Sequence, residues 1–379
     1  MPDYIWKLTG WPNVFVEDER LSLSIDTLRK KQFTFLGALS LEGAAERLRS
    51  TVDSLTTTAV DSSLIEGEVL DRASVRSSVA RRLGVDVGGA RQDDRIEGVV
   101  EMTLDAVRMY ADPLTHERLQ SWHAGLFPKA VGEASKPWMG AYRTVFDGPM
   151  RVLSGPVGRE RVHFEAPAAG DVSRMMDDFL AWYNGSRHTM NGLIRAAIAH
   201  LRFLTIHPFH DGNGRIARAI ADMTLAQDED SGDRFYSLSA QIQQERSAYY
   251  DALESTQQGT LDLTQWVFWF VECLERAIDN SQSVVTRARD AALFWQMHRD
   301  DEFNERQKKV LWCLIGNFEG DLNLRKYIAI SGSPRATAQR DLSDLVASGI
   351  LQPGGRGKST HYRIAERGAG CAAAPPADR

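Results

Sequence analysis

One short segment, residues 207–218, combines a histidine, an aspartate, a Gly-Asn-Gly run and two arginines. Gly212 and Gly214 lack a Cβ, so the backbone there can turn sharply and adopt positive φ. The residues that follow, up to Leu225, are rich in Ala, Arg, Ile and Leu and predict a helix. Free N–H groups and the positive end of the helix dipole converge at such a turn, which makes it a site for a phosphate.

The charged residues around this turn suit phosphate chemistry. Arg215 and Arg218 lie three residues apart, so they share one helix face, and each can form two hydrogen bonds with phosphate oxygens. Asp211 is a hard oxygen ligand suited to Mg²⁺ that bridges phosphates. His207 titrates near neutral pH, so it can serve as a general base. The alternative is a tight turn without a catalytic role, in which His207 is a buried, hydrogen-bonded imidazole. That alternative does not explain why Asp211 and two arginines surround the turn.

The segment matches the signature loop of the Fic family, H-x-F-x-[DE]-G-N-G-R-x-x-R, at every fixed position, and the chain resembles a member of that family. The resemblance implies a mainly helical enzyme that moves AMP from ATP onto a Ser, Thr or Tyr hydroxyl of a protein. His207 would be the catalytic base, and Asp211 would hold Mg²⁺ or Mn²⁺. The residues expected to bind the nucleotide here are Gly212, Asn213, Gly214, Arg215 and Arg218.

Residues 62–67 fit the inhibitory motif of the same family, [S/T]-x-x-x-E-[G/N], with Ser62, Glu66 and Gly67 at its fixed positions. In that family the motif lies on a helix whose glutamate reaches the second arginine of the signature loop, here Arg218. A carboxylate paired with Arg218 would occupy the donors that should hold the γ-phosphate and would repel it. ATP could still bind, but not in a pose aligned for transfer. The alternative is a solvated glutamate at a helix end.

Residues 150–154 and 161–164 are two short β-prone runs, and the turn-forming residues 155–158 join them. They resemble the Fic flap, a β-hairpin over the active site. An exposed strand can bind an extended target segment through main-chain hydrogen bonds and so place a hydroxyl. A surface hairpin without such a role is the alternative. The candidate flap residues are Val152, Leu153, Ser154 and Gly155.

Three further nucleotide-binding candidates follow the loop. In Fic proteins a Tyr-Tyr pair equivalent to Tyr249 and Tyr250 lies near the adenine, and a purine can stack on an aromatic ring. Gln257 stands where it could supply a ribose or base contact. Packing of the helix that carries them explains the tyrosine pair equally well.

The elements that must position these residues are predicted to be helices. Apolar residues recur at helical spacing in residues 97–110, 171–184, 191–206, 237–256 and 264–280. The helix over 191–206 runs straight into His207 and would aim the base from a rigid element. We therefore expect a mainly α fold, a Fic-type helical core with a β-hairpin flap. His123, an isolated histidine in a predicted helix, is expected to be structural.

The C-terminal residues 303–364 resemble a winged helix-turn-helix, with Ser333 and Pro334 as start signals for the third helix. This module could bind DNA, or it could be a protein-interaction or dimerisation module of the same fold. The side chains that would face DNA are Arg335, Thr337, Gln339 and Arg340 on the third helix, and Arg356 and Lys358 in the wing.

Five segments are expected along the chain. They are an N-terminal helical region with the inhibitory helix (1–95), the Fic catalytic core (96–280), a linking helix (281–300), a winged-helix-like domain (301–365) and a disordered tail (366–379).

Composition limits the classes of protein that fit. The chain has 379 residues and a formal net charge of −6, which argues against a protein coated with basic surface for nucleic acid. Its three cysteines are far apart and indicate neither a disulfide framework nor a zinc site. No apolar run reaches roughly 18 residues and no signal-peptide pattern opens the chain, so we expect a cytoplasmic protein without a membrane span.

These observations favour a self-inhibited transferase of AMP from ATP to a protein hydroxyl, with His207 as base and Glu66 as inhibitor. The target protein could include the chain itself, and a homodimer is a further expected partner. Three alternatives stay open. Glu66 could orient a water for removal of AMP, the chain could be a nucleotide-sensing DNA-binding transcriptional regulator, or the donor could be another nucleotide such as UTP.

Overall fold

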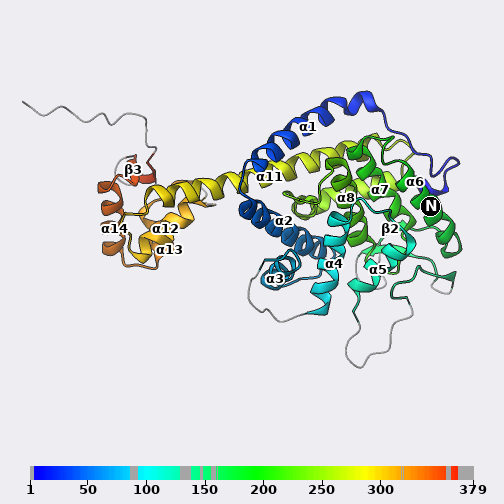
Figure 1. Ribbon diagram of the computed structural model, residues 1–379, viewed down its shortest axis with the longest axis horizontal. Coiled ribbons are helices and arrows are strands. Elements are labelled where there is room, and N and C mark those ends of the chain that lie inside the picture. The colour runs from blue at the N-terminus through cyan, green and yellow to red at the C-terminus, as the bar shows by residue number, and fades with distance from the viewer. Residues whose placement is uncertain are drawn as a thin grey trace, which may run out of the picture. The chain divides into compact units, whose positions relative to one another are not determined.

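The computed structural model describes residues 4–85, 93–128, 138–145, 148–154, 159, 161–316, 318, 320–355 and 360–365. The chain divides into two compact units, Met1–Gln282 and Ser283–Arg379. In both units the described residues are mainly helical, with one small β-hairpin in each (Figure 1). The boundary between the units falls inside the predicted linking segment 281–300, and the other predicted boundaries stay predictions.

The first unit carries the elements that surround the signature loop. Its N-terminal part contains η1 (Ile5–Lys7), α1 (Asp18–Ser40), α2 (Ala44–Ile65), α3 (Arg72–Arg82), α4 (Asp94–Arg108) and α5 (His116–Leu126). The hairpin strands β1 (Arg151–Ser154) and β2 (Arg161–Glu165) and the short η3 (Ala169–Asp171) follow. The remaining helices are α6 (Val172–Gly185), α7 (Gly192–Ile206), α8 (Asn213–Glu229), α9 (Leu238–Gln244), α10 (Arg246–Gln257) and α11 (Thr264–Met297).

The centre of this unit is the pair α7 and α8, which pack against each other. Every residue of α7 from Leu193 to Ile206 is buried, as expected for a helix whose apolar residues surround its axis. The side chain of Asn191 caps its start by accepting a hydrogen bond from Leu193 N at 3.0 Å. Because both helices are held in the core, the residues between them form a short, fixed connection.

Helix α2 brings the predicted inhibitory segment to this centre. It packs on α9, α3, α4 and α8, and Thr58 Oγ1 donates a hydrogen bond to Ser237 Oγ at 2.8 Å. The helix ends at Ile65, and Gly67 then adopts φ 85°, which reverses the chain. The residues on either side of Gly67, Glu66 and Glu68, both lie close to α8.

The N-terminal arm supports the flap. The ring of Tyr4 lies edge-on to that of Phe164 in β2, with 5.2 Å between centroids, and Trp6 Nε1 donates to Glu165 O at 2.8 Å. Packing against the hairpin therefore accounts for Tyr4 and Trp6.

Helix α11 corrects one expectation. A core helix that ends at Asn280 and a separate linking helix after it are expected, but Thr264–Met297 is a single helix. No glycine or proline occurs between these residues, so nothing in the chain interrupts the backbone hydrogen bonds.

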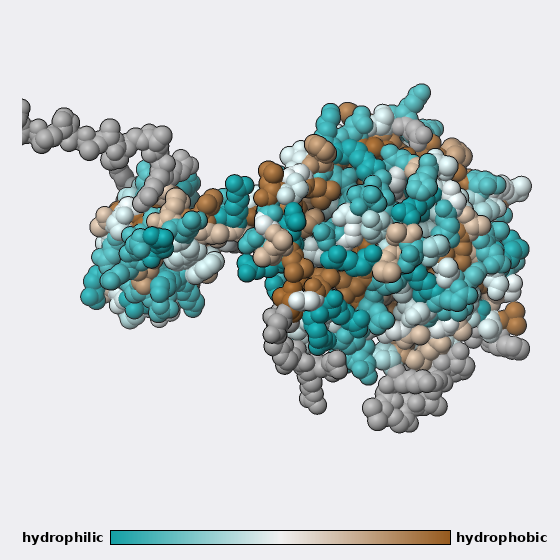
Figure 2. Space-filling model, viewed as in Figure 1, coloured by the Kyte–Doolittle hydropathy of each residue, from teal (hydrophilic) through white to brown (hydrophobic). Residues whose placement is uncertain are grey.

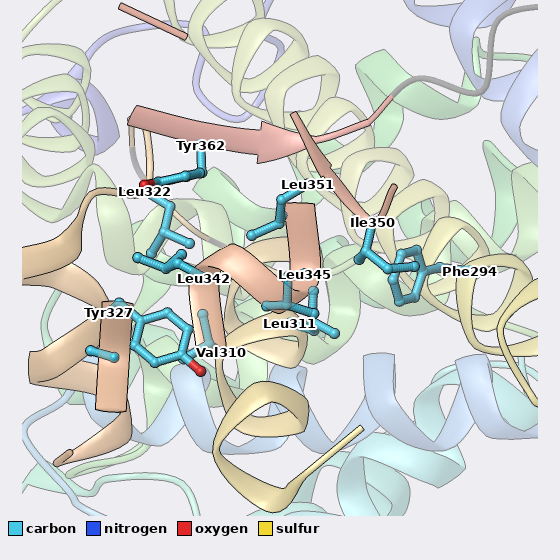
Figure 3. Close-up of a cluster of buried hydrophobic side chains, with 11 residues drawn as sticks. Phe294, Val310, Leu311, Leu322, Tyr327, Leu342, Leu345, Ile350, Leu351 and Tyr362 are labelled. Atoms are coloured by element: carbon cyan, nitrogen blue, oxygen red, sulfur yellow. The ribbon is translucent and has the colours of Figure 1, made fainter. Parts of the chain in front are cut away.

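The second unit contains α12 (Glu305–Ile315), α13 (Leu324–Ser331), α14 (Arg335–Ala347) and an antiparallel pair, β3 (Leu351–Gly354) and β4 (His361–Ile364). Its buried core joins the end of α11 to these elements (Figure 3). The core residues labelled there are Phe294, Val310, Leu311, Leu322, Tyr327, Leu342, Leu345, Ile350, Leu351 and Tyr362. The winged-helix assignment stays a prediction, and the predicted wing residues Arg356 and Lys358 and the tail 366–379 lie outside the described residues.

The surface is largely hydrophilic on the face that Figure 2 shows, with hydrophobic patches between the polar residues. Exposed apolar side chains include Leu23 and Phe33 on α1. The predicted homodimer stays a prediction. Among the described helices, none is long and apolar enough to span a bilayer.

Candidate active site

The signature loop begins where α7 ends. His207 terminates α7 with a left-handed backbone (φ 51°, ψ 59°), and Gly212 has φ 75° directly before α8. A left-handed backbone costs about 1–2 kcal/mol for a residue other than glycine. Surrounding contacts must therefore hold His207 in this conformation. Asn213 braces the loop from inside: its Oδ1 accepts from Phe209 N at 3.0 Å and its Nδ2 donates to Phe209 O at 2.8 Å. The amide of Asn213 therefore fixes the shape of the turn.

The imidazole of His207 is set up as a proton acceptor. Its Nδ1 lies 3.2 Å from the carbonyl oxygen of Leu204. A carbonyl only accepts, so Nδ1 carries the hydrogen and the lone pair is on Nε2. Burial lowers the pKa of His207 to about 4, and the charge of Arg143 acts in the same direction, whereas Glu66 and Asp211 act against it. At neutral pH the ring is uncharged and Nε2 can take a proton.

The carboxylate of Glu66 lies against the first turn of α8. Gly214 is the second residue of that helix, and a Cβ added to it would collide with Glu66 Oε1. The absence of a side chain at Gly214 therefore leaves the space in which this carboxylate lies. Since the N-terminus of a helix attracts anions, Glu66 occupies a position suited to a phosphate oxygen.

Arg218 is 1% exposed and is held by the last turn of α2. Its Nη2 donates to Glu66 Oε1 at 2.8 Å and to Ser62 O at 2.7 Å, and its Nε donates to Ser62 Oγ at 2.9 Å. Burial acts to lower the pKa of Arg218, but the charge of Glu66 leads the effects that more than offset it, so the pKa lies above its usual range. The guanidinium is charged, and Ser62 and Glu66 occupy its Nε and Nη2 donors.

Arg215, the other arginine of the loop, is also paired. Its partner is Glu68, which neither sequence motif includes. Arg215 Nη1 lies 2.6 Å from Glu68 Oε2, and its guanidinium stacks on the ring of Phe127 at 5.2 Å from the centroid. The side chain of Arg215 is only 5% exposed. Gly67 reverses the chain between Glu66 and Glu68, so one short segment supplies a carboxylate to each arginine. The second acid directly after the motif was the available signal.

Asp211 differs from these buried groups. Its side chain is 67% exposed, and its Oδ1 accepts a hydrogen bond from Gly212 N at 2.6 Å. The described part of the chain holds no cluster of three or more His, Cys, Asp or Glu side chains that could bind a metal by itself. Mg²⁺ is commonly bound by one or two carboxylates together with substrate phosphates. A single exposed carboxylate beside a phosphate turn fits that mode.

The hairpin predicted as the flap is present as β1 paired antiparallel with β2, with a break in register between Val152 and Leu153. Both of these side chains are exposed, Leu153 by 50%. Ser154 ends β1, and the predicted flap residue Gly155 lies outside the described residues.

The hairpin is anchored to α10 through Glu254. Its Oε1 lies 2.6 Å from Arg161 Nη2, and its Oε2 lies 2.7 Å from His163 Nδ1. Gln258 Nε2 also donates to His163 O at 2.9 Å. These contacts place β2 relative to the helix that follows the signature loop, and sequence patterns gave no sign of them.

The remaining nucleotide-binding candidates lie at different depths. Tyr249 is 1% exposed and its hydroxyl lies 2.9 Å from His200 Nε2, so its ring is enclosed in the core. Gln257 is 6% exposed, and its Nε2 donates weakly to Thr205 Oγ1 at 3.4 Å. Tyr250 is 37% exposed and lies beside the end of α2. Tyr249 and Gln257 are thus buried, Tyr250 has a partly exposed ring, and nucleotide binding by the three residues stays a prediction.

His123 packs against Phe209 of the signature loop. Its ring stacks on Phe209 with 4.1 Å between centroids and 7° between planes, and its Nδ1 accepts from Gly140 N at 2.9 Å. Burial lowers its pKa to about 4. These contacts agree with the structural role expected for this histidine.

Two family models match different parts of the chain. A model described as Fic/DOC family matches residues 113–225, which include the whole signature loop. A model described as Domain of unknown function (DUF4172) matches residues 4–85. Glu66 and Glu68 thus lie in the region that one model matches, and the arginines that they contact lie in the region that the other matches.

Curated relatives bear the name Protein adenylyltransferase Fic. The protein of Aedes aegypti is 28% identical over 219 residues, which are 57% of this chain and 39% of the relative. The protein of Drosophila grimshawi is 27% identical over 263 residues, 69% of this chain and 49% of the relative. The matches therefore span less than half the length of these relatives.

Solved structures share the fold. A Fic family protein from Desulfovibrio desulfuricans gives a TM-score of 0.52 at 22% identity, over 92% of this chain and 96% of that chain. A Fic domain containing signaling protein from Bacteroides thetaiotaomicron gives 0.50 at 21% identity, over 70% of this chain and 97% of that chain. The predicted mainly α, Fic-type core is confirmed. Residues 113–225, with the signature loop between α7 and α8, match the Fic/DOC model and form a Fic domain.

Proposed function

We propose that this chain is a self-inhibited protein adenylyltransferase, which moves AMP from ATP to a hydroxyl of a protein. The observation that carries the proposal is the neutral imidazole of His207, with its Nε2 lone pair, at the start of a phosphate-binding turn. A protein that only sensed nucleotide would have no use for a base there. The name shared by the curated relatives supports the same reaction.

In the proposed reaction, His207 Nε2 takes the proton of a Ser, Thr or Tyr hydroxyl while the hydroxyl oxygen attacks the α-phosphorus of ATP. The new P–O bond forms as the bond from the α-phosphorus to the bridging oxygen breaks, and pyrophosphate leaves with that electron pair. The backbone N–H groups of 212–214, Arg215 and Arg218 hold the phosphates. Positioning and charge neutralisation supply most of the catalysis in phosphoryl transfer.

Asp211 is the residue proposed to hold Mg²⁺ or Mn²⁺ together with the phosphates of ATP. The ion would supply positive charge that offsets the charge of the triphosphate. The exposed carboxylate, held toward the turn by Gly212 N, supports this assignment.

Self-inhibition is proposed to come from the segment Glu66–Glu68. Glu66 pairs with Arg218 and lies at the N-terminus of α8, while Glu68 pairs with Arg215. With both arginines neutralised by carboxylates, a triphosphate meets negative charge where it needs donors. Removal of AMP, with Glu66 orienting a water, is the alternative reaction at the same residues.

The experiment that tests the chemistry uses the Glu66→Gly protein with ATP labelled at either the α- or the γ-phosphate. Label from α-³²P-ATP should enter protein, label from γ-³²P-ATP should not, and pyrophosphate should be released. Glu66→Gly/His207→Ala should lose incorporation while it still binds ATP. Transfer of γ-label, or α-label that persists without His207, would contradict the proposed reaction. Replacing ATP with UTP tests the alternative donor.

A second function, DNA binding by the C-terminal unit, is supported by α14. Arg335, Gln339 and Arg340 are exposed on this helix, while Ala338, Leu342 and Leu345 on its other side are buried. Such a polar face at the start of a helix suits the major groove. Anisotropy of labelled duplex DNA tests this, and Arg335→Ala/Arg340→Ala should weaken binding and flatten its salt dependence. DNA binding that is unaffected by these changes would contradict a role for α14.

A further inference from the structure

We propose that Arg143 is a positioning residue, which fixes the catalytic His207 in its left-handed backbone conformation and ties it to the segment that leaves the flap. The inference rests on the proposed function, in which His207 is the base. Arg143 follows α5 in the chain, belongs to neither the signature loop nor the inhibitory segment, and has no role in the reaction described so far.

The guanidinium of Arg143 donates to three backbone carbonyls. Arg143 is 3% exposed, its Nε donates to His207 O at 2.8 Å, and its Nη2 donates to Ile206 O at 3.1 Å and to Pro167 O at 2.7 Å. The backbone N of Arg143 also donates to Pro208 O at 2.9 Å. Three of these hydrogen bonds thus go to the catalytic histidine and its two chain neighbours, and the fourth goes to Pro167.

These carbonyls are the ones that the end of a helix leaves unsatisfied. Ile206 is the last residue of α7 and His207 is its C-cap. The last carbonyls of a helix have no partner inside it, and a positive charge is favourable at that end. By binding both oxygens, Arg143 holds the chain where His207 takes positive φ, and so sets the direction of its imidazole.

The contact with Pro167 adds a second connection. Pro167 lies two residues beyond Glu165, the last residue of β2. The same Nη2 that contacts the end of α7 therefore also contacts the segment that leaves the hairpin. If the hairpin presents the target hydroxyl, Arg143 connects the segment that follows the hairpin to the backbone of the base.

Lysine cannot reproduce this arrangement. Its ammonium is a single nitrogen on a flexible stem, whereas the guanidinium directs donors from two nitrogens in a fixed plane. Arg143→Lys thus keeps the charge and loses the geometry, and Arg143→Met loses both. The pair of variants separates the two contributions.

A matched control exists at Arg118. Its Nη1 and Nη2 donate to backbone carbonyls of residues 105, 109, 112 and 113, around the end of α4. Arg118→Lys therefore removes the same kind of carbonyl clamp from a helix end that carries no proposed catalytic group. Its effect measures what the loss of such a clamp does to folding alone.

The experiment compares Arg143→Lys, Arg143→Met and Arg118→Lys, each in the Glu66→Gly background. The two Arg143 variants are expected to lower the rate of AMP incorporation about 100-fold, because a misplacement of ~1 Å near reacting atoms has an effect of that order. Their affinity for ATP, measured by calorimetry, should not change, because the guanidinium of Arg143 donates to carbonyls of residues 167, 206 and 207, whereas residues 212–218 are the ones proposed to hold the phosphates. Arg118→Lys should lower the melting temperature and leave the rate unchanged.

NMR titration of His207 gives a readout that does not depend on turnover. The charges that face His207 are Arg143, Asp211 and, in the native chain, Glu66. Asp211 is the same in all variants and residue 66 is glycine in all of them. Loss of the positive charge in Arg143→Met should therefore raise the pKa of His207, whereas Arg143→Lys should leave it nearly unchanged.

Full activity in both Arg143 variants would overturn the proposal, as would a loss of rate that Arg118→Lys reproduces. If the Glu66→Gly protein itself transfers no AMP, the proposed function fails, but the titration still tests Arg143. In that case, an identical His207 titration and identical backbone shifts at 206–208 in Arg143→Met and its parent would overturn the positioning role.

Discussion

Glu68 is the residue whose role is most open to a direct test at the scale of single side chains. Glu68→Gln should leave the fold intact and free Arg215 for phosphate. A partly exposed ion pair is worth up to about 1 kcal/mol, so the affinity for ATP should rise by ~5-fold. Calorimetric titration with ATP measures this, in the native chain and in Glu66→Gly.

The control for this prediction is Glu42→Gln, the same change in the connection between α1 and α2. It should leave the affinity for ATP at the native value. An unchanged affinity in Glu68→Gln as well would show that Arg215 is not restrained by this carboxylate.

Residues of the site could be predicted from the sequence only where they are close together in the chain. The turn at Gly212, the start of α8 and the pair of arginines follow from consecutive residues, and the motif identified them. Glu68 and Arg215 are 147 positions apart, and Arg143 and His207 are 64 apart. Their contacts depend on how α2, α5 and α7 pack, which no local pattern in one sequence specifies.

At the scale of elements, the flap depends on its anchor to α10. Glu254→Gln should weaken the contacts with Arg161 and His163, so that β2 separates more often from the helix. For a partly exposed pair worth about 0.5–1 kcal/mol, amide hydrogen exchange in 161–165 should become roughly 2–5-fold faster. Exchange followed by mass spectrometry measures the change.

A suitable comparison is Glu272→Gln, which alters a looser pair with Arg276 within α11, at 3.9 Å. Exchange in 161–165 should then stay at the native rate. Equal exchange rates in Glu254→Gln and the native protein would mean that Glu254 does not hold the hairpin in place.

Elements with clear periodicity could be predicted, and the errors occur where the pattern is silent. The helices over 171–184 and 191–206 match α6 and α7 because their apolar spacing is unambiguous. The break expected after Asn280 is absent, because no glycine or proline stands there to end the helix. Termination needs a local cause such as glycine, proline or a competing side chain.

At the scale of the whole molecule, buried histidines make stability depend on pH. Burial lowers the pKa of His123 and His207 to about 4 and that of His200 to about 3. In the unfolded chain these groups titrate near 6.5, so below that pH the unfolded state binds more protons. The contribution of these histidines to the free energy of unfolding is therefore fully present above about pH 6.5, and it decreases as the pH falls toward 4.

The expected loss is about 2 kcal/mol for each histidine between pH 7 and pH 5. Asp222, whose pKa burial raises to about 6, acts in the opposite direction and offsets part of it. Urea unfolding at the two pH values measures the difference. His200→Gln should reduce proton uptake on unfolding at pH 5 by about one proton. Equal stability at pH 5 and pH 7 would contradict burial of neutral imidazoles.

The central claim for the whole chain is that its N-terminal region silences its Fic core through Glu66. The most direct test is the initial rate of α-³²P-AMP incorporation in the native protein, Glu66→Gly and the control Glu42→Gly at the same ATP concentration. Glu66→Gly should be faster than the native protein by about tenfold or more, a gain of at least ~1.4 kcal/mol, and the control should match the native protein. Equal rates in the native and Glu66→Gly proteins would contradict self-inhibition by this carboxylate.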